Sequence, residues 1–73
     1  MLELGQRVAI WSPSACMFLN ATVVRMWDHP EGDPYVSVET APGKVWVRSQ
    51  SCVYFEPADE LNQMANGDYA VIS

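Results

Sequence analysis

Two alternating stretches of hydrophobic and polar residues lie in the middle of the chain and predict a β-hairpin. Tyr35 to Thr40 and Val45 to Arg48 both alternate, and Pro42-Gly43 lies between them. Proline presets the φ angle of about −65° at the second position of a type II turn, and glycine accepts the positive φ of the third position. We therefore expect two antiparallel strands joined by a tight turn.

Three further segments have the pattern of short strands. Residues 5–11 alternate and end at Ser12-Pro13, with Val8 and Ile10 directed inward. Residues 18–27 are apolar on both faces, so this strand should bend across a barrel corner or be covered on both sides. Residues 52–55 form a short closing strand. Together these segments predict a mostly β fold of about five short strands, arranged as a small barrel or barrel-like sheet, which removes exposed edges.

The end of the chain changes character and predicts a short helix. Pro57 stands at a first-turn position, acidic residues follow it, and Asn66-Gly67 is a stop signal. The apolar side of a helix over residues 57–65 would hold Leu61, Met64 and Ala65. Residues 68–73 are either a sixth strand or a frayed tail. We expect a single domain over residues 1–73, with the barrel over about residues 4–56 and the helix and tail over 57–73.

The charge balance excludes some classes of partner. The chain has four basic and nine acidic residues and a net charge of −5. Nucleic-acid binding draws most of its affinity from Lys and Arg on phosphates, so direct nucleic-acid binding is not expected. Anionic membranes are disfavoured for the same reason. We expect the partner to be another protein, with a basic surface toward which the acidic residues would steer it.

The cellular compartment follows from the absence of export signals. The sequence shows neither a signal peptide nor a membrane-spanning apolar run, which favours a cytoplasmic protein. Cys16 and Cys52 are then two free thiols, and a disulfide between them is the alternative if the protein is exported.

Residues suited to catalysis or metal binding are few. His29 is the only histidine and lies in an acidic, proline-flanked loop where solvation is expected. Asp28, Glu31 and Asp33 share this loop, but their spacing does not match a calcium loop, and no pair of residues has zinc spacing. Cys52 adjoins an apolar run and is interpreted as a small core residue. The sequence therefore predicts no enzyme, no cofactor and no metal.

Exposed aromatic and arginine side chains are the candidate binding residues. If Val45 and Val47 face the core, Trp46 and Arg48 are displayed together on the outer face. By the same alternation Arg7, Ala9 and Trp11 oppose Val8 and Ile10. Because Trp and Arg are enriched in interface hot spots, we expect a protein-binding surface. The alternative is a packing role against the C-terminal helix. The predicted protein-binding residues are Arg7, Trp11, Trp46 and Arg48.

Several motifs resemble known families. The opening Gly5-Gln-Arg-Val8, the long second strand and the hairpin closing on Val45-Trp-Val47 resemble an SH3-like barrel. Within that architecture, Pro30-Glu-Gly32 followed by Pro42-Gly43 is similar to the small plasmid-encoded dihydrofolate reductases. Those enzymes use a Val-Gln-Ile-Tyr run on the strand after the turn, where this chain has Val45-Trp-Val-Arg48.

In length and charge the chain also resembles small acidic phage-encoded regulators of host RNA polymerase. This resemblance implies a non-enzymatic, protein-binding transcription regulator or inhibitor acting on bacterial RNA polymerase. The alternative is an oligomeric SH3-like barrel that binds a small molecule, similar to the plasmid-type reductases but without their active-site run.

Overall fold

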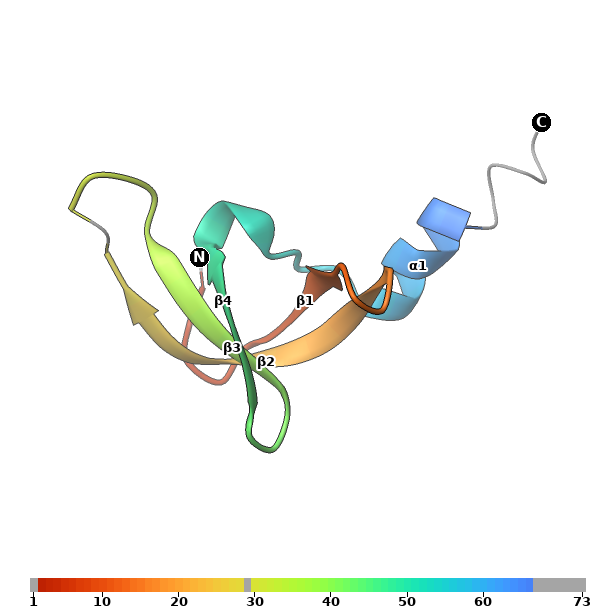
Figure 1. Ribbon diagram of the computed structural model, residues 1–73, viewed down its shortest axis with the longest axis horizontal. Helices are drawn as coiled ribbons and strands as arrows, with labels where there is room; N and C mark the ends of the chain where they lie inside the picture. The colour runs from red at the N-terminus through yellow and green to blue at the C-terminus, as the bar shows by residue number, and fades with distance from the viewer. Residues whose placement is uncertain (1, 29, 67–73) are drawn as a thin grey trace.

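A meander of antiparallel strands followed by a short helix makes up the protein in the computed structural model, which describes residues 2–28 and 30–66 (Figure 1). The strands pair in the order β1-β2-β3-β4. The mostly β fold with a C-terminal helix is thus confirmed, whereas the predicted loop histidine and the segment 68–73 lie outside the described residues. The elements are β1 (Arg7–Ser12), β2 (Met17–Trp27), β3 (Tyr35–Ala41), β4 (Lys44–Ser49), the 3₁₀ turn η1 (Gln50–Cys52) and α1 (Ala58–Asn66).

The core is built mainly from β-branched residues on one face of the twisted sheet. Val8 and Ile10 point inward from β1, as the alternation predicts, and Val36 and Val38 point inward from β3. β-branched side chains suit a pleated, half-buried surface, and burying one stabilises the fold by about 1.5–3 kcal/mol. The other members of the core cluster are Leu2, Ala21, Val23 and Val53, with Trp46 packed against them.

The sheet is not closed into a barrel, so the prediction of a five-stranded barrel is wrong. β1 and β4 are the two outer strands and do not pair with each other. After β4 the chain enters η1 and then meets β1 at a single bridge, where Ala9 and Tyr54 exchange backbone hydrogen bonds of 2.8 and 2.9 Å. η1 occupies Gln50–Cys52 and Pro57 has no N–H to donate, so only residues 53–56 are left between them for a closing strand. Ala9, which was expected to face outward, is buried as well.

α1 is attached to β2 by two asparagine side chains. Asn20 Oδ1 accepts a hydrogen bond of 2.9 Å from the Ala58 N–H and so caps the first turn of the helix. Asn62 pairs with the backbone of Phe18: its Oδ1 accepts from the Phe18 N–H at 2.7 Å, and its Nδ2 donates to the Phe18 carbonyl at 3.1 Å. The helix therefore packs on the sheet, although Met64, on its predicted apolar side, is 53% exposed.

A β-bulge in the β3–β4 hairpin decides which face of β4 meets the core. Pro42-Gly43 forms the expected turn, with Gly43 at a φ of +80° and Ala41 paired with Lys44. Glu39 then pairs with Val45, so Thr40 is left without a partner in the register. A one-residue shift of this kind moves every following side chain to the opposite face.

The predicted orientation of β4 is consequently wrong. Val45 and Val47 are 53% and 52% exposed, whereas Trp46 lies against the core and its Nε1–H donates to Thr40 Oγ1 at 3.1 Å. In a hairpin without the bulge, Val47 instead of Trp46 would pair with the buried Val38. The unpaired Thr40 therefore has two effects: it exchanges the inner and outer faces of β4, and its hydroxyl accepts the hydrogen bond of Trp46, which the exchange turns inward.

Candidate protein-binding groove

An apolar groove of about 510 Å³ lies where the end of β1, the start of β2 and the segment after β4 meet. Trp11 and Phe18 come from paired positions on β1 and β2, and Tyr54 is brought beside them by its bridge to Ala9. The residues that line the groove are Trp11, Pro13, Phe18, Arg48, Ser51, Cys52 and Tyr54. We refer to this set as the aromatic groove.

Three aromatic rings in the groove support one another. Phe18 lies between Trp11 and Tyr54, with ring centroids 5.1 and 5.2 Å apart and interplanar angles of 70° and 84°. Edge-to-face pairs of this kind contribute about 0.5–1.5 kcal/mol each beyond their buried area. Trp11 and Tyr54 are nevertheless each 41% exposed. The groove thus offers large aromatic surfaces whose positions are already fixed.

Arg48 joins the two outer strands of the sheet at the rim of the groove. Its Nη2 donates to the Trp11 carbonyl on β1 at 3.4 Å, and its Nη1 donates to the Val47 carbonyl at 2.9 Å. The guanidinium carbon also lies 5.3 Å from the centroid of the Trp46 ring. A planar guanidinium is suited to this combination of hydrogen bonds and stacking. Arg48 therefore brings a positive charge to a groove that is otherwise apolar.

The structure brings together two of the four predicted binding residues. Trp11 and Arg48 lie in the aromatic groove and contact each other through the Trp11 carbonyl. Trp46 lies beneath Arg48 and is turned toward the core. Arg7 is exposed, as predicted, but lies apart from the groove, where its Nη1 donates to Thr22 Oγ1 at 3.1 Å.

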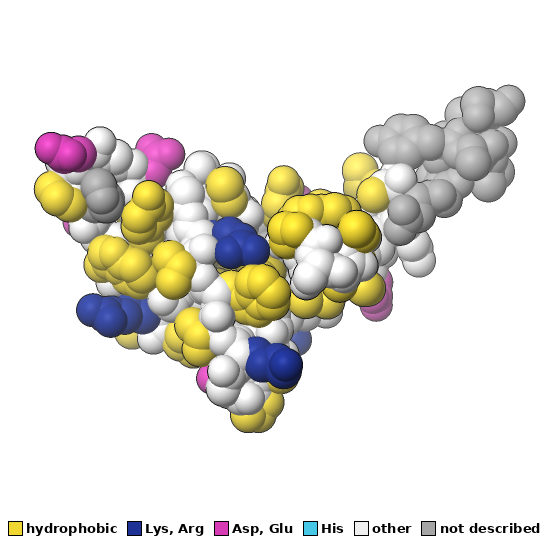
Figure 2. Space-filling view, viewed as in Figure 1, with side chains coloured by type: hydrophobic (Ala, Val, Ile, Leu, Met, Phe, Trp, Pro, Cys, Tyr) yellow, Lys and Arg dark blue, Asp and Glu magenta, His cyan; other side chains and the backbone are white. Residues whose placement is uncertain are grey.

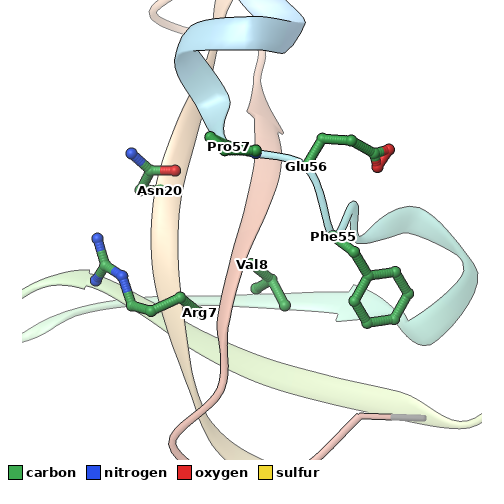
Figure 3. A pocket seen from close by; sticks show the side chains of 6 residues that line it. All are labelled: Arg7, Val8, Asn20, Phe55, Glu56 and Pro57. Carbon is green, nitrogen blue, oxygen red and sulfur yellow. The ribbon is translucent and has the colours of Figure 1, made fainter.

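Arg7 lines a separate hollow of about 240 Å³ beside the start of the helix. Figure 3 shows Arg7 and Asn20 on one side of β1 and Phe55 and Glu56 on the other, pointing away from one another. Asn20 is already engaged as the cap of α1. The polar groups of this hollow therefore do not converge on a common point, as a catalytic site would require.

Sequence reasoning missed Phe18, Tyr54 and Cys52 as groove residues. Phe18 pairs with Trp11 in the register, so an assumed β1–β2 pairing would have placed the two together. Tyr54 reaches the groove only through its bridge to Ala9, for which the sequence carries no local signal. Cys52 was expected in the core but is exposed, because η1 turns it outward. Cys16 is exposed as well, and both thiols are free.

The described residues contain no group of three or more His, Cys, Asp or Glu side chains that could hold a metal ion. Asp28, Glu31 and Asp33 are exposed in the loop between β2 and β3. In the part of the chain that the structure describes, no helix has the length and apolar character needed to cross a membrane.

Comparison with known proteins gives no further assignment. Searches of family models, of curated proteins and of solved structures found no match to this chain.

Proposed function

We propose that this protein is a non-enzymatic protein-binding module whose contact site is the aromatic groove. The observation that carries the proposal is the trio of Trp11, Phe18 and Tyr54, which are locked edge to face while two of the rings stay 41% exposed. Trp, Tyr and Arg are the residue types that most often dominate binding energy in protein interfaces. The groove combines all three types, because Arg48 lies at its rim.

The rigidity of the groove supports this function. Rings that are held by one another and by the sheet lose little conformational freedom when a partner arrives, so more of the contact energy remains as affinity. The Tyr54 backbone is held by two hydrogen bonds to Ala9, which keeps the ring in place independently of any ligand. A small fold with so few buried residues gains no stability from leaving two large rings exposed, and a partner surface would cover them.

The order of elements supports the finer proposal that the fold is a reduced SH3-like barrel. A four-stranded meander leads into a 3₁₀ turn, after which the chain returns to the first strand. In this proposal the Ala9–Tyr54 bridge stands for a fifth strand that is shortened to one residue pair. The aromatic groove would then lie at the seam where the barrel is incompletely closed.

The identity of the partner is proposed from charge and from the resemblance to phage regulators. The net charge of −5 of the whole chain favours steering toward a partner whose overall surface is basic. Large nucleic-acid-handling enzymes carry such surfaces, and we propose a regulator or inhibitor of bacterial RNA polymerase as the specific function. Purified RNA polymerase is accordingly the first partner to test.

Neighbouring exposed aromatic residues provide a matched pair of variants for that test. Tyr54 is 41% exposed and lines the groove, whereas Phe55 is 56% exposed and lies outside it. Tyr54→Ala should weaken binding to RNA polymerase by roughly tenfold or more, and Phe55→Ala should leave it within about twofold. Surface plasmon resonance with immobilised protein measures both, and circular dichroism checks that both variants fold.

Equal loss of binding in the two variants would remove the groove from the proposal. If the wild-type protein does not bind RNA polymerase, this partner is rejected. Capture from bacterial lysate with the same two variants would then test the groove itself. If a protein is retained by wild type and by Phe55→Ala but not by Tyr54→Ala, the result supports protein binding through the aromatic groove. If Tyr54→Ala retains the same protein as wild type, the result contradicts it.

A further inference from the structure

The outer edge of β4 is a second surface, which shares only Arg48 with the aromatic groove. β4 pairs with β3 on one side only, because it is the last strand in the order β1-β2-β3-β4. Alternate residues of such an edge direct their backbone N–H and C=O groups away from the sheet, where another strand can pair with them. On this edge, within the described residues, the Val47 carbonyl accepts a hydrogen bond from Arg48 Nη1 of the same strand.

The two faces of β4 differ in chemistry. Val45 and Val47 lie on the outer face, and about half of each side chain is exposed. Lys44, Trp46 and Arg48 alternate with them and lie on the opposite face. Both ends of the strand are therefore positively charged on one face, while the middle of the other face is apolar.

The region around β4 is basic although the protein as a whole is acidic. Residues 40–55 contain no Asp or Glu, and Glu39 turns its Oε2 toward the hairpin, where it accepts from the Gly43 N–H at 3.3 Å. Figure 2 shows β4's side of the molecule as a field of hydrophobic and Lys or Arg side chains, with Asp and Glu confined to its margins. This charge separation favours an acidic partner at this edge.

From these observations we propose that β4 binds an extended acidic segment of a partner protein by strand addition. The complementary segment reads acid, apolar, any residue, apolar, acid: its two apolar residues face Val45 and Val47, and its two acids face Lys44 and Arg48. Backbone hydrogen bonds along the edge supply affinity, and the alternating side chains supply selectivity. The incoming N–H takes over the Val47 carbonyl from Arg48.

A second copy of this chain is a poor occupant of the same edge. Antiparallel pairing of two β4 strands about the Trp46 position would set Lys44 of each copy opposite Arg48 of the other. Like charges directly across a strand pair are destabilising, and edge lysines are a common protection against self-pairing. The same two cations that repel a copy attract an acidic strand.

A capped synthetic peptide, Thr-Glu-Val-Thr-Val-Glu-Thr, tests this inference on the intact chain. Titration followed by ¹⁵N–¹H NMR should give a Kd below about 1 mM, with amide shifts concentrated on β4. Replacing both Glu of the peptide by Lys should weaken binding at least fivefold. N-methylation of alternate peptide bonds in the peptide removes the N–H groups that would donate to β4 without changing a side chain, and it should abolish binding.

Charge reversals in the protein provide the matched controls. Lys44→Glu should weaken binding of the Glu-containing peptide about fivefold. Arg7→Glu changes the net charge by the same amount but lies on β1, so it should leave the affinity for this peptide within about twofold. Tyr54→Ala should not change peptide binding, so the inference stands or falls separately from the aromatic groove.

Three results would overturn the inference. The first is the absence of β4 shifts up to about 1 mM peptide, and the second is equal binding of the Glu and Lys peptides. The third is self-association of the unliganded chain through β4, seen as concentration-dependent β4 shifts together with a dimer in sedimentation.

Discussion

The two outer strands of the sheet, β1 and β4, both alternate β-branched apolar residues with other residues, but these apolar residues are buried on β1 and exposed on β4. Val8 and Ile10 on β1 are 3% and 0% exposed, whereas Val45 and Val47 on β4 are 53% and 52% exposed. β1 pairs with β2 residue by residue without a shift, while the pairing of β4 is displaced by Thr40. The comparison teaches that alternation identifies two faces of a strand, but the register decides which face is buried.

The strands also differ in what covers their outer edges. β1 receives the Tyr54 backbone at Ala9, and the β1–β2 hairpin is contacted by α1 through Asn20 and Asn62. β4 has no comparable cover in the described residues, and only Arg48 reaches from it to β1. The β1 edge of the sheet is thus covered, whereas the β4 edge, where we propose strand addition, is open in the described part of the chain.

The reversed faces of β4 can be tested with Trp46 and Val47 as a pair. Trp46→Ala should lower the free energy of unfolding by about 3 kcal/mol, because it empties part of the core and leaves Thr40 without its donor. Val47→Ala should change it by less than about 0.5 kcal/mol, since the side chain is half exposed. Urea denaturation followed by circular dichroism measures both. A larger loss for Val47→Ala would restore the orientation expected from alternation.

Removal of the bulge should make β4 resemble β1. Deleting Thr40 produces a regular hairpin in which Val45 and Val47 face inward and Trp46 faces solvent, at a cost of about 2 kcal/mol because two valines fill the space of an indole poorly. Acrylamide quenching of tryptophan fluorescence should rise. Thr40→Ala is the control: it keeps the bulge, loses one hydrogen bond and costs about 1 kcal/mol without a change in quenching. Unchanged quenching after the deletion would show that Thr40 does not set the register.

The cover on the β1–β2 side can be loosened through Asn62. Asn62→Ala removes both hydrogen bonds to the Phe18 backbone and should cost about 1 kcal/mol. Hydrogen exchange should accelerate selectively at the Phe18 amide, while the amides of β4 keep their rates. Gln63→Ala, an exposed position on the same helix, is the control and should leave both the free energy of unfolding and the exchange rate of the Phe18 amide unchanged. If the Phe18 amide stays protected in Asn62→Ala, the helix is held by other contacts.

Local sequence patterns were sufficient to predict the main elements of the fold. The Pro42-Gly43 turn, the strand around Val8 and Ile10, and the helix that follows Pro57 all rest on local chemistry, and all three are present. The closed barrel was predicted wrongly because closure depends on how far the chain around Tyr54 pairs with β1, which no local pattern encodes; only the single Ala9–Tyr54 bridge forms. The face of Trp46 was predicted wrongly because a threonine bulge leaves no signature in an alternating strand.

The candidate groove was predicted only in part, for related reasons. Trp11 and Arg48 were chosen as exposed members of alternating strands, and they meet because the twisted sheet brings β4 near β1. Phe18 and Tyr54 join them through long-range pairing, which the sequence pattern does not report.

The asparagine attachments of α1 have a consequence for the order of folding. A helix of this length is marginal in water, because nucleating its first turn costs more than so few following bonds return. The partners that cap and hold it are Asn20, 38 residues before Ala58, and Phe18, 44 residues before Asn62. These contacts exist only after β2 has its final shape, and closing such long loops is slow compared with forming a hairpin. We therefore expect the helix to form last, so that its far-ultraviolet signal in a refolding experiment reports completion of the sheet.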